Sequence, residues 1–212
     1  ETFIIEKLKF IEDKNIQVEP KDVILFGFGR IGRLLARELM SQKGKGEQLR
    51  LRVIVLRNID DQSIIKRASL LRTDSVHGKF PGTVITDLEN KALIINGHSV
   101  KLIKASEPEE VDYTKYEINN ALLIDNTGVY RDKVALTRHL NAVGVSKVLL
   151  TAPGNEIPNI VFGANHLEYD INSFDIFSAA SCTTNAITPI LKVVNDKLGI
   201  EKGHIETIHA YT

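Results

Sequence analysis

The chain has no second cysteine, no excess of either charge and no long apolar run, and each absence removes a class of protein. Its single cysteine, Cys182, excludes an intrachain disulfide and fits a reducing compartment, so we expect the cytoplasm. The 27 basic and 27 acidic side chains cancel, which argues against a broad nucleic-acid-binding surface. The longest apolar runs, such as residues 23–26, are far too short to span a bilayer, and we expect no membrane segment.

Residues 1–20 are predicted to form an N-terminal extension. Charges interrupt every apolar stretch in it, so no secretory signal is expected. Ile4, Leu8 and Ile11 recur at helical spacing, which predicts a short amphipathic helix that ends before Pro20. The helix lacks the cationic, aromatic-anchored face of membrane-surface helices. We therefore expect it to dock on the protein's own domain or on a partner.

Strand-like and helix-like patterns alternate through most of the remaining chain. Strands are predicted at residues 23–26, 51–56, 121–125 and 147–151, with weaker candidates at 160–162 and 175–178. Helices are predicted at residues 31–40, 63–71 and 133–143, the last with Gly144 as its C-cap. This alternation predicts right-handed βαβ units and a mostly parallel sheet.

The middle of the chain has a different pattern. Residues 83–86, 91–95 and 98–104 are predicted as short strands, and Asn96-Gly97 joins the last two. Asn-Gly between apolar runs is the strongest short hairpin signal. The predicted fold class is therefore α/β, a Rossmann-type doubly wound sheet with an antiparallel insertion.

A glycine-rich turn follows the first predicted strand. Gly27, Gly29 and Gly32 fit G-x-G-x-x-G between a strand and a helix, which is the context that this motif requires. The spacing permits a tight turn, close approach of the backbone to a pyrophosphate and close helix–strand packing. A purely structural turn is the alternative, and the flanking elements favour dinucleotide binding.

The residues after the second strand leave the choice between NAD and NADP open. A carboxylate there would bind the adenosine ribose and repel a 2′-phosphate. Arg57 stands where an acid is expected, Asn58 follows, and Asp60 comes slightly late. Arg57 either pairs with the 2′-phosphate of NADP or is a solvated loop charge.

Cys182 lies in the run Ser181-Cys182-Thr183-Thr184-Asn185, at the start of a predicted helix. A cysteine attacks as its thiolate, which a helix N-terminus or an imidazole stabilises. His209 follows downstream as a candidate base. The alternative is an inert buried cysteine. The other histidines have no partner at metal-ligand spacing, and we expect no metal site.

These motifs occur together, and in order, in one known family. The matching segments are residues 27–33, 74–80, 126–129, 151–153, 178–185 and 207–212. Over residues 21–212 the chain resembles the phosphorylating glyceraldehyde-3-phosphate dehydrogenases. The resemblance implies oxidation of glyceraldehyde 3-phosphate to 1,3-bisphosphoglycerate with NAD or NADP, in a homotetramer, with no nucleic acid or membrane partner. Erythrose 4-phosphate as the substrate and a cofactor-binding fragment without turnover are the alternatives.

The resemblance also implies roles for single residues of the reaction. Cys182 matches the catalytic nucleophile, and His209 matches the histidine that activates it and acts as the base. Ser181 and Thr183 match residues near the attacking inorganic phosphate. Thr212 matches a ligand of the substrate's own phosphate.

Further roles concern the cofactor. Arg30 and Ile31 match the turn on the pyrophosphate, and Asn126, Thr127 and Gly128 match the loop on the nicotinamide side. The chain departs from the family pattern at Phe26, at residues 58–60, at residues 106–108 and at Asn126. Most of these departures surround the adenosine half or the glycine turn, so they concern cofactor preference.

The resemblance divides the chain into three parts. We expect the extension at residues 1–20, a dinucleotide-binding domain at 21–181 and the incomplete beginning of an α+β catalytic domain at 182–212. That last part is predicted to hold one helix and a strand at residues 205–211. We expect the chain by itself to bind cofactor and to turn over poorly.

Overall fold

The computed structural model describes residues 20–42 and 48–209, and these form a sheet with helices on both faces. The strands of the main sheet are β1 (Lys21–Phe26), β2 (Leu49–Leu56), β5 (Val84–Asp87), β6 (Ala92–Ile95), β7 (His98–Lys104), β8 (Ala121–Asp125), β9 (Val145–Leu150) and β10 (Ile176–Ser178). The α-helices are α2 (Arg30–Ser41), α3 (Asp61–Arg72), α4 (Lys133–Leu140) and α5 (Cys182–Leu198). The remaining elements are the strand pair β3 (Thr73–Asp74) and β4 (Gly78–Lys79) and the 3₁₀ helices η2 (Pro108–Glu110), η3 (Tyr113–Tyr116) and η4 (Ile171–Ser173).

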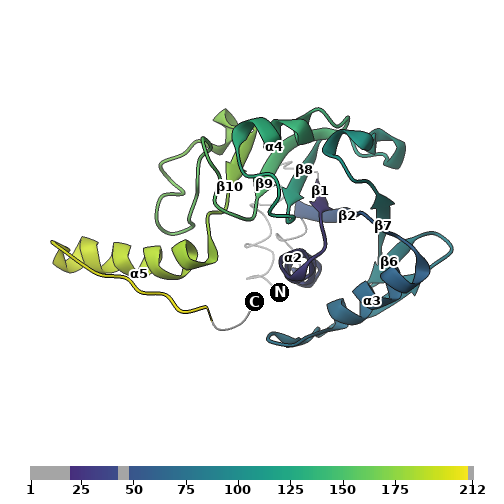
Figure 1. Ribbon diagram of the computed structural model, residues 1–212, viewed down its shortest axis with the longest axis horizontal. Helices are drawn as coiled ribbons and strands as arrows, with labels where there is room; N and C mark the ends of the chain where they lie inside the picture. The colour runs from purple at the N-terminus through teal and green to yellow at the C-terminus, as the bar shows by residue number, and fades with distance from the viewer. Residues whose placement is uncertain (1–19, 43–47, 210–212) are drawn as a thin grey trace, which may run out of the picture.

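The main sheet has the order β10-β9-β8-β1-β2-β7-β6-β5 (Figure 1). From β10 to β7 every neighbouring pair is parallel, and β6 and β5 add antiparallel strands at the edge. The predicted Asn96-Gly97 hairpin is confirmed, since Asn96 and Gly97 both have positive φ, at 49° and 85°. The antiparallel insertion is continuous with the main sheet, because β7 pairs with β2.

The sheet separates two apolar cores. Along β1, Val23 and Leu25 belong to one buried cluster, and Ile24 and Phe26 belong to the other. Helices α2 and α3 pack on the first face, and α4 packs on the second. The predicted α/β doubly wound class is therefore confirmed, and β1 is apolar throughout residues 23–26 because both of its faces are buried.

Some predicted boundaries are wrong. The helix at residues 133–143 ends at Leu140, and Asn141 is its C-cap in place of Gly144. Gly144 serves the next turn, with φ of +102° and with the carbonyl of Ile118 in the space that a side chain would fill. The following strand consequently starts at Val145, before the predicted residue 147.

Two predicted strands are absent from the part of the chain that the structure describes. Residues 160–162 form a turn region that meets the sheet only through a bridge between Asn159 and Ser178. Residues 205–209 are irregular and exposed, because no described strand lies beside them to accept their backbone hydrogen bonds. The helix predicted for the N-terminal extension lies outside the described residues. Within the described residues, no helix is long and apolar enough to cross a membrane.

Candidate cofactor crevice and cysteine site

A crevice opens where β1, β2 and β8 end, and its cavity measures about 390 Å³. Ligands of open parallel sheets bind outside the carboxyl ends of the strands, and cavities of this size are typical of ligand sites. Hydrogen bonds fix its floor: the Gly27 N–H donates to the Val55 carbonyl at 3.0 Å, and the Asn126 N–H donates to the Phe26 carbonyl at 2.9 Å. The predicted cofactor residues that line the cavity are Gly27, Gly29, Arg57, Asn126 and Thr127.

The glycine turn leaves room beside the backbone where a pyrophosphate would lie. Gly27 has φ of +92°, a conformation that favours glycine. A Cβ on Gly32 would stand 2.7 Å from the Gly27 carbonyl oxygen, so only glycine lets α2 start this close to the turn. A Cβ on Gly29 would meet nothing within 4 Å. The open side at Gly29 and the partial positive charge at the N-terminus of α2 fit a dinucleotide phosphate.

Gly32→Ala should destabilise the protein by about 1–3 kcal/mol, because the added methyl group has to displace the Gly27 carbonyl. Gly29→Ala is the matched control, because its methyl group points into open space and Gly29 has an ordinary φ of −71°. We expect its stability to change by less than about 1 kcal/mol, with weaker dinucleotide binding. Urea unfolding and cofactor titration of both variants test this, and equal losses of stability would contradict it.

The first turn of α2 is anchored to the β3–β4 hairpin. The Arg30 Nε lies 3.2 Å from an oxygen of Asp74, and its Nη2 donates to Ser75. The Asp74 carboxylate also accepts from the backbone N–H groups of Val76 and His77 at 2.9 and 3.0 Å. Arg30, Ile31 and Gly32 therefore begin the helix behind the glycine turn and do not line the cavity.

Asp74 makes folding stability dependent on pH. The backbone N–H of His77, followed by that of Val76, holds the pKa of this carboxyl well below its usual value near 3.8. A carboxyl with a lowered folded pKa adds stability above its unfolded pKa and loses it as the pH falls toward the folded pKa. Asp74→Asn should therefore lower the urea midpoint at pH 7, and the gap to the wild type should narrow below about pH 4. Urea unfolding from pH 7 to pH 3 measures it, and a gap that stays constant would contradict it; Asp175→Asn, at an exposed carboxylate, is the control.

Asn58 and Asp60, two predicted cofactor residues after β2, form hydrogen bonds with each other and with the start of α3. The Asp60 carboxylate caps α3 by accepting from the Ser63 N–H at 2.7 Å, and it also accepts from the Asn58 amide. This cap explains why the helix begins at Asp61, before the predicted residue 63. Hydrogen bonds from Ser63 and then Asn58 lower the pKa of Asp60. Asn58 and Asp60 lie outside the lining of the cavity, whereas Arg57 is part of it.

The loop after β8 is held by a buried carboxylate. Asp125 accepts from the Thr127 N–H at 2.7 Å and from the Thr127 hydroxyl at 2.8 Å. Its other oxygen lies 2.8 Å from His139 Nε2, and both side chains are fully buried. Asn126 and Thr127 therefore present their loop to the crevice from a fixed base, and Gly128 lies just beyond its lining.

Cys182 is the first residue of α5, as the sequence predicts, and its side chain is exposed. Ala180 has a left-handed φ of 58°, which turns the chain from β10 into the helix. The Ser181 hydroxyl then caps the helix by accepting from the Thr184 N–H at 3.0 Å. The thiol-bearing residue is thus placed at a helix N-terminus, where unpaired N–H groups stabilise a thiolate. Pro189 lies within α5, and the helix continues through it to Leu198.

His209 lies beside the start of α5. The chain after Leu198 runs back along the helix (Figure 1), and His209 Nε2 lies 3.2 Å from the Thr183 hydroxyl. The structure thus brings the predicted base to the residue that follows Cys182. Thr212 lies outside the described residues.

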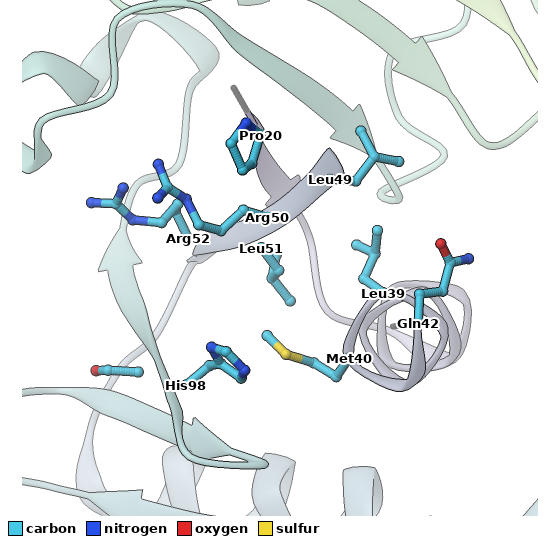
Figure 2. A pocket seen from close by; sticks show the side chains of 10 residues that line it. Pro20, Leu39, Met40, Gln42, Leu49, Arg50, Leu51, Arg52 and His98 are labelled. Carbon is cyan, nitrogen blue, oxygen red and sulfur yellow. The ribbon is translucent and has the colours of Figure 1, made fainter. Parts of the chain in front are cut away.

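Another cavity, of about 290 Å³, lies at the opposite ends of the parallel strands (Figure 2). Leu49, Leu51 and His98 line it from the starts of β2 and β7, and Leu39 and Met40 line it from the end of α2. The amino ends of β2 and β7 lie here, away from the glycine turn and from Cys182. It is therefore a poor candidate for the cofactor.

Comparison with known proteins agrees with this geometry. A family model described as the glyceraldehyde 3-phosphate dehydrogenase, NAD binding domain, matches residues 21–133. The chain belongs to the glyceraldehyde 3-phosphate dehydrogenase family. A second model, the C-terminal domain of the same family, matches residues 181–212. The chain is thus part of an oxidoreductase family, and its family domain indicates NAD or NADP as cofactor.

Several curated relatives carry the family name. A "Glyceraldehyde-3-phosphate dehydrogenase-like protein" of Pseudomonas aeruginosa is 55% identical over 196 residues, 92% of this chain and 42% of that protein. "Glyceraldehyde-3-phosphate dehydrogenase 2" of Nostoc is 41% identical over 90% of this chain and 54% of its own length. "Glyceraldehyde-3-phosphate dehydrogenase 1" of Bacillus subtilis is 35% identical over 88% and 52%. The chain spans about half the length of these relatives.

The sequence did not predict several residues around this dehydrogenase-family site. Arg67 lines the crevice from α3, and Tyr130 lines it beyond the β8 loop. Asp125 and His139 form the buried pair below that loop. In the sequence, Asp125 ends an apolar strand and His139 lies within a predicted helix, but no pattern predicts that the two side chains are in contact.

Proposed function

We propose that the chain is the cofactor-binding and nucleophile-bearing part of a phosphorylating glyceraldehyde-3-phosphate dehydrogenase. In the proposed reaction, glyceraldehyde 3-phosphate and inorganic phosphate give 1,3-bisphosphoglycerate while NAD or NADP is reduced. The observation that carries the proposal is the position of Cys182 in a chain of this family. It is the only cysteine in the sequence, and it lies exposed at the N-terminus of α5.

Cys182 is proposed as the nucleophile. Its thiolate attacks the aldehyde carbon, and the new carbon–sulfur bond gives a hemithioacetal. His209 takes the hydroxyl proton of this adduct as it is oxidised to a thioester. The nicotinamide cofactor, when bound, supplies the acceptor for the hydride. Inorganic phosphate then attacks the thioester carbon, the acyl–sulfur bond breaks, and the Cys182 thiolate is released.

The neighbouring hydroxyls are proposed to position phosphate. The Thr183 hydroxyl lies at the helix N-terminus next to Cys182, and Ser181 forms the cap beneath it. Unpaired N–H groups in the first turn of α5 favour an anion at this end of the helix. Thr212 is proposed to bind the phosphate that the substrate carries.

The cofactor is assigned to the crevice at the carboxyl ends of the strands. The turn at Gly27 and Gly29 would hold the pyrophosphate with the start of α2, and Arg30 would keep that start in place through Asp74. Asn126 and Thr127 would contact the nicotinamide side. A homotetramer in the cytoplasm, without nucleic-acid or membrane partners, completes the proposal.

A steady-state assay tests the proposal on the full-length natural polypeptide that contains this chain. We expect reduction of NAD or NADP that requires both glyceraldehyde 3-phosphate and inorganic phosphate. Faster turnover of erythrose 4-phosphate would replace the proposed substrate by that sugar. Dinucleotide binding without turnover of either aldehyde would overturn the proposed reaction.

A further inference from the structure

The charged side chains in the lining of the crevice are all positive. The charged residues that line the cavity are Arg57, at the end of β2, and Arg67, from α3. Among the described residues no carboxylate lines it. A site that binds the ribose hydroxyls of NAD through an acid requires a carboxylate here, whereas an arginine at this place accommodates a 2′-phosphate.

The carboxylates that are close in sequence are already engaged elsewhere. Asp60 caps α3 through the Ser63 N–H at 2.7 Å. Glu107, near the Ser106 side of the crevice, lies 2.8 Å from the guanidinium of Arg138. These local partners keep both acids out of the lining, so they do not neutralise its arginines.

Both arginines have N–H groups that make no hydrogen bond to the described residues. Arg57 is exposed and makes no hydrogen bond or ion pair with another described residue. Arg67 donates from Nη1 to the Phe28 carbonyl at 3.2 Å, which fixes its guanidinium beside the glycine turn. Its buried Nε has no hydrogen-bond partner among the described residues. Burial lowers the pKa of Arg67, which reflects a cation held partly out of water without a carboxylate beside it.

We infer that Arg57 and Arg67 form a subsite for the 2′-phosphate of NADP, so that this crevice binds NADP more tightly than NAD. Arg57 supplies an exposed guanidinium that pairs with the phosphate, and Arg67 supplies a second positive charge that the Phe28 carbonyl holds in place. Guanidinium groups suit this role because their planar fork pairs with two phosphate oxygens at once. The inference deepens the proposed function, because it names the form of the cofactor that the proposed dehydrogenase uses.

Adenosine fragments test the subsite without catalysis. The probes are 5′-AMP, 2′,5′-ADP and 3′,5′-ADP, titrated calorimetrically into the full-length polypeptide together with NAD and NADP. We expect 2′,5′-ADP to bind about tenfold more tightly than 5′-AMP. The isomer 3′,5′-ADP has the same charge, so its weaker binding would separate a placed phosphate from general attraction.

Variants then assign the subsite to its residues. Arg57→Ala should weaken NADP and 2′,5′-ADP about tenfold and leave NAD and 5′-AMP within about twofold. Lys66→Ala removes an exposed charge from the same helix as Arg67, outside the cavity lining, and should change neither ligand class. Arg67→Met should act like Arg57→Ala, but it also removes the bond to Phe28, so Arg57 provides the decisive comparison.

The outcomes separate this inference from the proposed reaction. Equal affinities for 2′,5′-ADP, 3′,5′-ADP and 5′-AMP would overturn the subsite, as would an Arg57→Ala variant that weakens NAD and NADP alike. Selective binding of 2′,5′-ADP together with no aldehyde oxidation would uphold the subsite and refute the reaction. Phosphate-dependent aldehyde oxidation with NAD preferred over NADP would support the proposed reaction and overturn the subsite.

Discussion

Cys182→Ser should lower turnover by a factor of at least about 10³ in the full-length polypeptide, with unchanged dinucleotide affinity. A serine hydroxyl is not ionised near neutral pH, so the nucleophile of the proposed first step is lost. The oxygen also cannot form the thioester from which phosphate displaces the acyl group. The measurement is kcat with glyceraldehyde 3-phosphate and phosphate, beside a cofactor titration.

The position of Cys182 supplies a second measurement. Because the Cys182 side chain is exposed, iodoacetamide should label it, and activity should be lost in proportion to the labelling of this residue. Unbound N–H groups at the start of α5 stabilise the thiolate that reacts. Bound aldehyde should slow the labelling. Retention of more than about a tenth of the activity by Cys182→Ser, with intact cofactor binding, would remove this residue from the mechanism.

Ser181→Ala distinguishes the nucleophile from the helix that carries it. The variant loses the hydroxyl that accepts from the Thr184 N–H, and it should cost about 1 kcal/mol of unfolding free energy. Activity should fall far less than in Cys182→Ser, because the thiol remains. A loss as large as that of Cys182→Ser would show that the Ser181 hydroxyl, through the helix cap or through the bound phosphate, matters as much as the sulfur.

The sequence specified those parts of the site that depend on neighbouring residues. The G-x-G-x-x-G turn follows β1 as predicted, because the tight turn at Gly27 and the close approach at Gly32 are local requirements. Cys182 opens α5 as predicted, because Ser181 is a strong N-cap. Alternating strand and helix patterns likewise predicted the doubly wound sheet, since hydrophobic periods report which faces are buried.

The errors arise where a distant partner, or its absence, decides the structure. Arg67 reaches the crevice only because α3 packs against the glycine turn, a contact between residues far apart in the sequence. The cap that Asp60 forms on α3 was missed, because this helix was predicted to begin at residue 63 and begins at Asp61. Residues 205–211 have a strand-like pattern, but residues 205–209 form no strand, because a strand needs a neighbour for its hydrogen bonds.

His209→Asn should lower kcat by about 10²–10⁴-fold with little change in cofactor affinity. The imidazole is proposed to take a proton from the Cys182 adduct, and an amide cannot accept it. In the structure, His209 Nε2 is 3.2 Å from the Thr183 hydroxyl, so the ring is held beside the residue next to the nucleophile. His204→Asn is the matched control, because His204 lies exposed in the same segment and makes no hydrogen bond or ion pair with another described residue.

The pH dependence separates a base from a structural contact. If His209 is the base, His209→Asn should change the pH dependence of kcat, whereas His204→Asn should leave it as in the wild type. Thr183→Val removes the hydroxyl that contacts the ring, so it should lower kcat while the pH dependence of the wild type persists. An unchanged pH dependence in His209→Asn would mean that another group is the base. Slower iodoacetamide labelling of Cys182 in His209→Asn would further show that the imidazole also stabilises the thiolate before substrate binds.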